Sequence, residues 1–255
     1  RAPYDTMFDH LDFKIPDTYG KSKEGFPSWA SPVGQKMSQQ AMSRYFGMVK
    51  CIDDNIGEIM EALKKTGQLD NTIVVFTSDH GDLCGEHGRN NKGVPMEGSA
   101  KIPFVLYYPS MVKAKSVINQ ALTTVDFMPT ILGLIGVEGS GKEEGRDASG
   151  LFVQNNSEWK DVAFIRGTGQ KPGESDSNWF GAITDRYKLI YAPKDEPWLI
   201  DLENDPNELT NYYKNSEYKN TVKELTAELL DYGKKHGDSR IEIEGIKKQM
   251  EAVME

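Results

Sequence analysis

Two potential metal ligands, Asp79 and His80, directly follow a run of β-branched and aromatic residues. Residues 72–78, Thr-Ile-Val-Val-Phe-Thr-Ser, have the composition of a fully buried parallel strand. Open α/β sheets form their ligand sites in the crevice beyond the carboxyl ends of such strands. We therefore expect Asp79 and His80 to be held at a ligand site at the edge of an α/β sheet.

A glycine-rich, charged loop over residues 81–98 follows these ligands and contains Lys92. Hard divalent cations such as Ca²⁺ or Mg²⁺ prefer carboxylate oxygens and need more of them than Asp79 alone supplies. Lys92 provides a compact positive charge that suits a tetrahedral oxyanion. The alternative is structural, with Asp79 capping the following turn and His80 packing under the loop. Ligands, glycines and a lysine within about twenty residues favour a functional site.

The elements that must position these side chains follow the rhythm of a doubly wound α/β sheet. A helix is expected over residues 37–63, where apolar residues recur at three- and four-residue spacing, and Gly67 is placed to end it. A second buried strand is expected at 102–108. Another helix is expected at 123–135, with Thr124 as its cap.

A segment rich in Gly, Lys, Glu and Ser ends near residue 150 and is interpreted as a linker. Residues 1–150 are predicted to be part of an α/β core, with residues 1–35 as a loop-rich lead-in. Residues 151–255 are predicted to form a small α+β subdomain, in which a helix at 218–234 crosses an antiparallel sheet and a helical tail follows. The strands of that sheet are expected at 162–166, 179–184, 187–191 and 198–202.

The composition excludes some classes of function. The net charge of the 255 residues is −9 without any basic cluster, which argues against a nucleic-acid partner. No apolar run approaches the roughly 20 residues that span a bilayer. The two cysteines, Cys51 and Cys84, are too few for a disulfide framework and form no CxxC motif, so both are expected to be unpaired.

A series of short motifs lies in one order at residues 71–82, 85–88, 91–93, 97, 102–103, 125–132, 184–190, 199–206 and 208–211. This series resembles the second half of a type I sulfatase, a formylglycine-dependent enzyme of the alkaline-phosphatase-like superfamily. The resemblance covers most of residues 36–236. It implies the C-terminal part of a doubly wound α/β/α sandwich, followed by the small α+β subdomain.

By this resemblance, Asp79 and His80 are the second pair of ligands for a calcium ion, with Mg²⁺ less favoured. Lys92 matches the lysine that contacts the sulfate, and His87 matches a pocket histidine, so these two are the expected catalytic residues. The sequence lacks the Cys/Ser-x-Pro/Ala-x-Arg motif that gives rise to formylglycine, and the family's Asp-Asp metal pair. Both are expected in an N-terminal part that precedes this chain, and the chain alone is expected to be inactive.

The implied reaction is hydrolysis of a sulfate monoester, and the implied partner is a sulfated small molecule or a sulfated glycan. A phosphodiesterase or phosphonate hydrolase of the same superfamily is an alternative, and so is a non-catalytic, degenerate half-domain. A sugar or aryl site is considered at the 166–180 loop, lined by Arg166, Lys171, Trp179 and Phe180. The resemblance also favours a periplasmic or secreted location.

Overall fold

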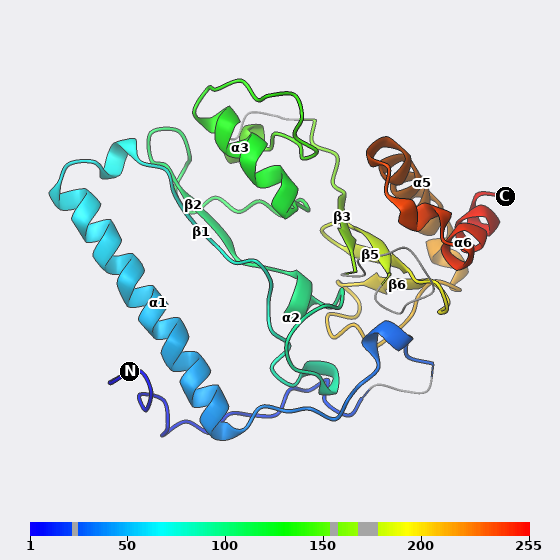
Figure 1. Cartoon of the computed structure of the whole chain (residues 1–255), viewed down its shortest axis with the longest axis horizontal. Helices are drawn as coiled ribbons and strands as arrows, with labels where there is room; N and C mark the ends of the chain where they lie inside the picture. Colours follow the sequence, from blue (N-terminus) through cyan, green and yellow to red (C-terminus); the bar gives the residue numbers. More distant parts are fainter. Residues whose placement is uncertain (22–24, 154–157, 168–177) are drawn as a thin grey trace.

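The computed structural model describes residues 1–255 except 22–24, 154–157 and 168–177. Figure 1 shows a long helix, a two-stranded ribbon and a short helix on one side of the molecule, and a four-stranded sheet with two helices on the other. This combination confirms the predicted α/β class. In the described residues, no helix is long and apolar enough to cross a membrane.

Helix α1, Gln39–Lys65, is the long helix predicted from the periodicity of its apolar residues. The Ser38 hydroxyl accepts a hydrogen bond from the backbone N–H of Ala41 at its N-terminus. Gly67, with a φ of +67°, follows its last turn as expected. Its apolar face is nevertheless open, since most of the face's large side chains are exposed. These are Phe46, Met48, Val49, Ile52 and Ile59.

Strand β1, Val74–Thr77, pairs with strand β2, Phe104–Tyr107, in antiparallel fashion. The prediction of a fully buried parallel strand at 72–78 is therefore wrong in two respects. The strand direction is set by the intervening loop, because Gly81 N–H donates to the Ser99 carbonyl at 2.8 Å and turns the chain back along β1. The β1 side chains are half-buried or exposed, because in the described structure β2 is the only strand beside β1.

Helix α3, Phe127–Leu134, follows a 3₁₀ turn over Thr124–Asp126. Its helical character was predicted, but the capping residue is Thr123 rather than Thr124. The Thr123 hydroxyl and the Asp126 carboxylate form a reciprocal capping box, in which Asp126 accepts from the Thr123 backbone N–H at 3.0 Å.

The C-terminal sheet is antiparallel in the order β3-β4-β5-β6, as predicted from its short apolar runs. The strands are β3 Ala163–Arg166, β4 Phe180–Ile183, β5 Tyr187–Tyr191 and β6 Trp198–Asp201. Helices α5, Lys219–His236, and α6, Glu244–Met254, cover one face of this sheet (Figure 1). These helices correspond to the predicted crossing helix and helical tail.

The opposite face of this sheet is covered by the segment that contains the predicted site. Ile190 and Ile200 of the sheet pack in one buried cluster with Leu83, Val94 and Met96. Side chains alternate between the two faces of a strand, so this arrangement explains why β5 and β6 are apolar on both sides. The short helix α2, Glu97–Ala100, ends the segment and leads into β2. The sheet therefore acts as a platform for residues 81–97.

Candidate active site

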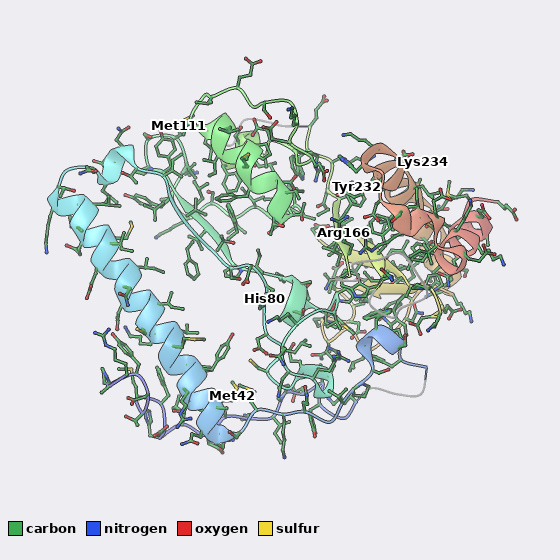
Figure 2. All side chains as sticks on the ribbon, in the orientation of Figure 1. Met42, His80, Met111, Arg166, Tyr232 and Lys234 are labelled. Atoms are coloured by element: carbon green, nitrogen blue, oxygen red, sulfur yellow. The ribbon has the colours of Figure 1, made fainter. Side chains whose placement is uncertain are left out.

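Asp79 and His80 follow β1 along the chain, and His80 lies between β1 and α2 (Figure 2). The Asp79 side chain is 85% exposed and that of His80 is 40% exposed. Exposure of this kind means that neither group is a packed core residue, which argues against the purely structural alternative for His80. Asp79 Oδ1 accepts a hydrogen bond from the backbone N–H of His80 at 3.0 Å, which orients the carboxylate.

The geometry of Asp79 and His80 fits a shared cation. His80 Nδ1 lies 2.8 Å from the Gly81 carbonyl oxygen, and a carbonyl only accepts, so the proton of the neutral ring is held on Nδ1. His80 Nε2 is then free as a ligand, 3.4 Å from Asp79 Oδ2. Two atoms that bind one ion at about 2.4 Å each, with an angle of roughly 90° at the ion, are separated by about this distance. A carbonyl that fixes the tautomer of a ligand histidine is also the usual support around a metal site.

This pair does not complete a metal site by itself. Within the described ranges, no group of three or more His, Cys, Asp and Glu side chains could hold a metal ion. Calcium usually takes six to eight oxygen ligands, so one carboxylate and one imidazole supply only a fraction of a coordination shell.

The loop after His80 folds back on itself and returns the chain to the site at Lys92. Leu83 N–H donates to the Asn91 carbonyl at 2.9 Å, so the two arms of the loop run antiparallel. The Asp82 carboxylate accepts from the Asn91 backbone N–H at 2.9 Å and reinforces the same pairing. Continuing that register places Lys92 beside Asp82. The loop thus returns the exposed Lys92 to the neighbourhood of Asp82, and its role beside Asp79 and His80 stays a prediction.

Ser99, at 4% exposure, fastens both arms of this loop. Its carbonyl accepts from Gly81 N–H at 2.8 Å, and its hydroxyl accepts from Gly93 N–H at 3.1 Å. The residues joined are the immediate neighbours of His80 and Lys92. Gly81 must be glycine here, because a Cβ atom at this position would lie 2.2 Å from the Gly98 carbonyl oxygen. The spacing of the proposed ligands and the lysine is therefore set by buried backbone contacts.

His87 occupies a different environment from the other predicted site residues. It is 2% exposed, has a φ of +51°, and its ring stacks on Phe26 with the ring centroids 6.0 Å apart. Its backbone N–H donates to the Thr18 hydroxyl at 2.9 Å. Burial lowers the pKa of its imidazole to about 4, outweighing the opposite effect of Asp205. His87 is thus a neutral interior residue at pH 7, and its contact with substrate stays a prediction.

The low pKa of His87 makes stability fall in mild acid. Histidine has a pKa near 6.5 in the unfolded state, so the unfolded chain takes up the proton more readily than the folded chain. The free energy of unfolding is therefore highest above pH 6.5 and declines as the pH falls toward 4. We expect the wild-type chain to lose about 2 kcal/mol more than a His87→Asn variant between pH 7.5 and 5.0. Urea unfolding at the two pH values measures this, and equal losses would show that His87 is not buried in neutral form.

The proposed sugar or aryl site at 166–180 is corrected by the structure. Trp179 is 4% exposed and Phe180 is completely buried, so neither offers a surface for a ligand. The Trp179 indole N–H instead donates to the Gly93 carbonyl at 3.4 Å. Arg166 forms an ion pair with the buried Asp238 at 3.0 Å. Lys171 lies outside the described residues. Trp179 and Phe180 are buried because β4 starts at this point and is covered on both faces.

The sequence interpretation missed the buried charges next to the site. Lys188, completely buried, contacts both Glu97 and Glu208 with nitrogen–oxygen distances of 2.6 and 2.7 Å. The sequence did contain a signal for this cluster, because Lys188 is the one charged residue in the otherwise apolar strand at 187–191. A lysine at such a position needs carboxylate partners. The expectation of unpaired cysteines is confirmed, since Cys51 and Cys84 are both free.

Comparison with known proteins identifies the family of this chain. The model of the sulfatase family matches residues 6–137, and a second model, N-sulphoglucosamine sulphohydrolase, C-terminal, matches residues 85–235. An arylsulfatase of Clostridium perfringens is 35% identical over 201 residues, which is 78% of this chain and 41% of that enzyme. The chain therefore spans about two fifths of the length of this relative.

Solved structures give the same result for the fold. A protein solved in complex with its substrate D-glucosamine-2-N,6-O-disulfate is 33% identical, with a TM-score of 0.71, over 78% of this chain and 42% of that one. The phosphonate monoester hydrolase of Agrobacterium radiobacter is 26% identical, with a TM-score of 0.66, over the same shares of the two chains. The fold is thus alkaline-phosphatase-like, and the chain belongs to the sulfatase family.

Proposed function

We propose that this chain is the C-terminal part of a sulfatase that hydrolyses sulfate monoesters, and that it supplies half of the calcium site and the lysine that contacts the sulfate. The proposal rests chiefly on one arrangement. Asp79 and His80 present two free ligand atoms 3.4 Å apart, and Ser99 ties their loop to the arm that carries Lys92. We refer below to the longer protein containing this chain as the complete sulfatase.

The residues of this chain have separate tasks in the proposed reaction. Asp79 and His80 hold the cation, which when bound neutralises charge on the sulfate oxygens. Lys92 donates hydrogen bonds to those oxygens as the bond to sulfur breaks and negative charge grows. It is available for this task because no described carboxylate lies within ion-pair distance of its ammonium group. The nucleophile, a formylglycine by family resemblance, comes from outside this chain.

The open apolar face of α1 supports the idea of a larger domain. Five large apolar side chains of α1 are more than two fifths exposed, as is Val105 of β2. Large apolar side chains exposed together on one helix are typical of a surface that another part of a protein covers. The relatives and structures described above extend well beyond the region they share with this chain. We therefore propose that the remaining α/β core covers these surfaces, and that the chain is inactive without it.

The expected substrate is a sulfated small molecule or a sulfated glycan. A relative with a bound disulfated glucosamine supports the glycan class. The net charge of −9 means that the anionic substrate must be captured locally, by Lys92 and the cation, against the mean field of the protein. A periplasmic or secreted location is part of this proposal.

A phosphonate hydrolase or phosphodiesterase is the second candidate, favoured by the likeness to the Agrobacterium enzyme. Lysine and a hard cation stabilise phosphoryl and sulfuryl oxygens alike, so the site does not decide between them. Parallel assays of the complete protein with an aryl sulfate, an aryl phosphonate and an aryl phosphodiester distinguish the two. A sulfatase should prefer the sulfate ester, and a preference for either phosphorus ester would replace the proposal. Catalysis of none of the three would favour a non-catalytic half-domain.

An Asp79→Asn variant of the complete sulfatase should bind calcium more weakly. The substitution replaces a charged ligand oxygen by a neutral one of the same shape, and loss of one ligand charge typically weakens binding by about 10–100-fold. Calorimetric titration of the metal-free protein with Ca²⁺, Mg²⁺ and Mn²⁺ measures the effect and identifies the preferred ion. Asp53→Asn, an exposed carboxylate on α1, is the matched control. Unchanged affinity in Asp79→Asn would remove Asp79 from the metal site.

A further inference from the structure

A cluster of three charges, in which Lys188 and Glu208 are buried and Glu97 is half-buried, joins the C-terminal sheet to the loop that carries Lys92. The Lys188 ammonium group, on β5, contacts Glu97 and Glu208 and also donates to the Pro95 carbonyl at 2.9 Å. Glu208 in turn accepts a hydrogen bond from the Glu97 backbone N–H at 2.7 Å. These contacts fix the backbone at two points, Pro95 and Glu97, three and five residues after Lys92. We call Lys188, Glu97 and Glu208 the buried charge cluster.

The peptide that follows Lys92 is fixed on both sides. Gly93 N–H donates to the Ser99 hydroxyl, and the Gly93 carbonyl accepts from the Trp179 indole. Trp179 directly precedes β4, so this contact also comes from the C-terminal sheet. The backbone from residue 93 to 97 is thus held by hydrogen bonds to buried groups at three of its five residues.

We propose that Lys188 is a positioning residue of the sulfatase, and that the C-terminal sheet sets the place of Lys92 through the buried charge cluster and Trp179. This inference rests on the proposed function of Lys92 as the sulfate-contacting residue. Lys188 contacts neither the substrate nor the cation in this account. It acts by holding the backbone on which Lys92 stands.

Lys92 needs such support because its own side chain does not fix the position of its ammonium group. Its four-carbon stem is flexible and exposed, so the position of its ammonium group depends on where the backbone begins. A shift of about 1 Å in a charge-stabilising group can cost on the order of 100-fold in rate. β5 is rigid because Leu189, Ile190 and Tyr191 are completely buried, so it provides a fixed reference for the loop. A direct consequence is that the C-terminal subdomain is needed for the chemistry as well as for the fold.

A double-mutant cycle in the complete sulfatase tests whether Lys188 acts through Lys92. Lys188→Met, Lys92→Ala and the double variant are compared with wild type by kcat/KM on an aryl sulfate, at a temperature where thermal melts show all four folded. We expect Lys188→Met to lower kcat/KM by about 10–100-fold when Lys92 is present. In the Lys92→Ala background we expect no further loss, because the group to be positioned is gone.

Hydrogen exchange in the 255-residue chain gives a second readout that does not depend on activity. Lys188→Met should speed the exchange of amides in peptides covering residues 91–101 while those of α5 stay protected. Lys247→Met is the matched control, since it removes an exposed lysine from a 3.0 Å ion pair with Glu242 on the other side of the sheet. It should change neither exchange at 91–101 nor kcat/KM.

If Lys188→Met does not fold, Trp179→Phe takes its place in both experiments, because it removes the indole N–H through which the C-terminal sheet holds the Gly93 carbonyl. Equal losses of activity with and without Lys92, or unchanged exchange at 91–101, would overturn the positioning role while leaving the proposed function intact. Full activity of Lys92→Ala alone would instead contradict the proposed function. The two failures are therefore distinguishable.

Discussion

A Lys92→Ala variant of the complete sulfatase is expected to lose about 100- to 1,000-fold in kcat while remaining folded. Removal of one preorganised group that stabilises developing charge typically costs this much. Lys92 makes no ion pair with another described residue and its side chain is exposed, so the substitution removes no packing from the core. Steady-state kinetics with an aryl sulfate measure the loss in kcat, and a thermal melt shows whether the variant is folded.

Two comparisons sharpen this test. Lys113→Ala removes another exposed lysine, from a loop outside the site, and should leave kcat unchanged. Lys92→Arg retains the charge but changes the shape of the donor, and it should recover only part of the activity. Wild-type turnover in Lys92→Ala would mean that this lysine does not meet the sulfate.

The second large effect is expected on stability. A Lys188→Met variant of the 255-residue chain should lose about 3–5 kcal/mol in free energy of unfolding, because it leaves the buried Glu208 carboxylate without its cation and removes one of the two lysines that pair with the half-buried Glu97. Burial raises the pKa of Glu208, and the Lys188 ammonium group opposes this shift. Without Lys188, the Glu208 carboxyl should take up a proton, so the loss should be smaller at pH 5 than at pH 8. Urea unfolding at the two pH values measures it.

The control for this prediction is again Lys247→Met, whose ion pair with Glu242 is exposed and should contribute less than about 1 kcal/mol. A second substitution, Glu208→Gln, should restore part of the stability lost in Lys188→Met, since it removes one unpaired charge. A loss in Lys188→Met no larger than in the control would mean that the cluster is hydrated rather than buried.

The sequence was most informative where local patterns decide the structure. The strand predicted at 187–191 coincides with β5, and the helix at 218–234 lies within one or two residues of α5. These segments carry their own apolar periodicity and bury it within the same chain, so pattern and structure agree. Asp79, His80 and Lys92 could be proposed from the sequence because strand-end ligands and a loop lysine are close along the chain, and their shared role stays a prediction.

The errors come from contacts between distant residues. The 72–78 segment has the composition of a buried parallel strand, yet the loop tied by Gly81 and Ser99 makes β1 an antiparallel partner of β2. Trp179 was interpreted as a ligand surface because no local signal shows that Gly93, far away in sequence, accepts its indole N–H. The role of Lys188 was missed for the same reason, since its partners lie some 90 and 20 residues away.

The most direct test of the central claim is a crystal structure of the complete protein grown with calcium and sulfate. We expect a cation bonded to an Asp79 carboxylate oxygen at about 2.3–2.6 Å, with His80 beside it. We also expect a sulfate oxygen within about 3 Å of Lys92 Nζ. A cation and sulfate bound together elsewhere, with Asp79 and Lys92 both facing solvent, would contradict the account.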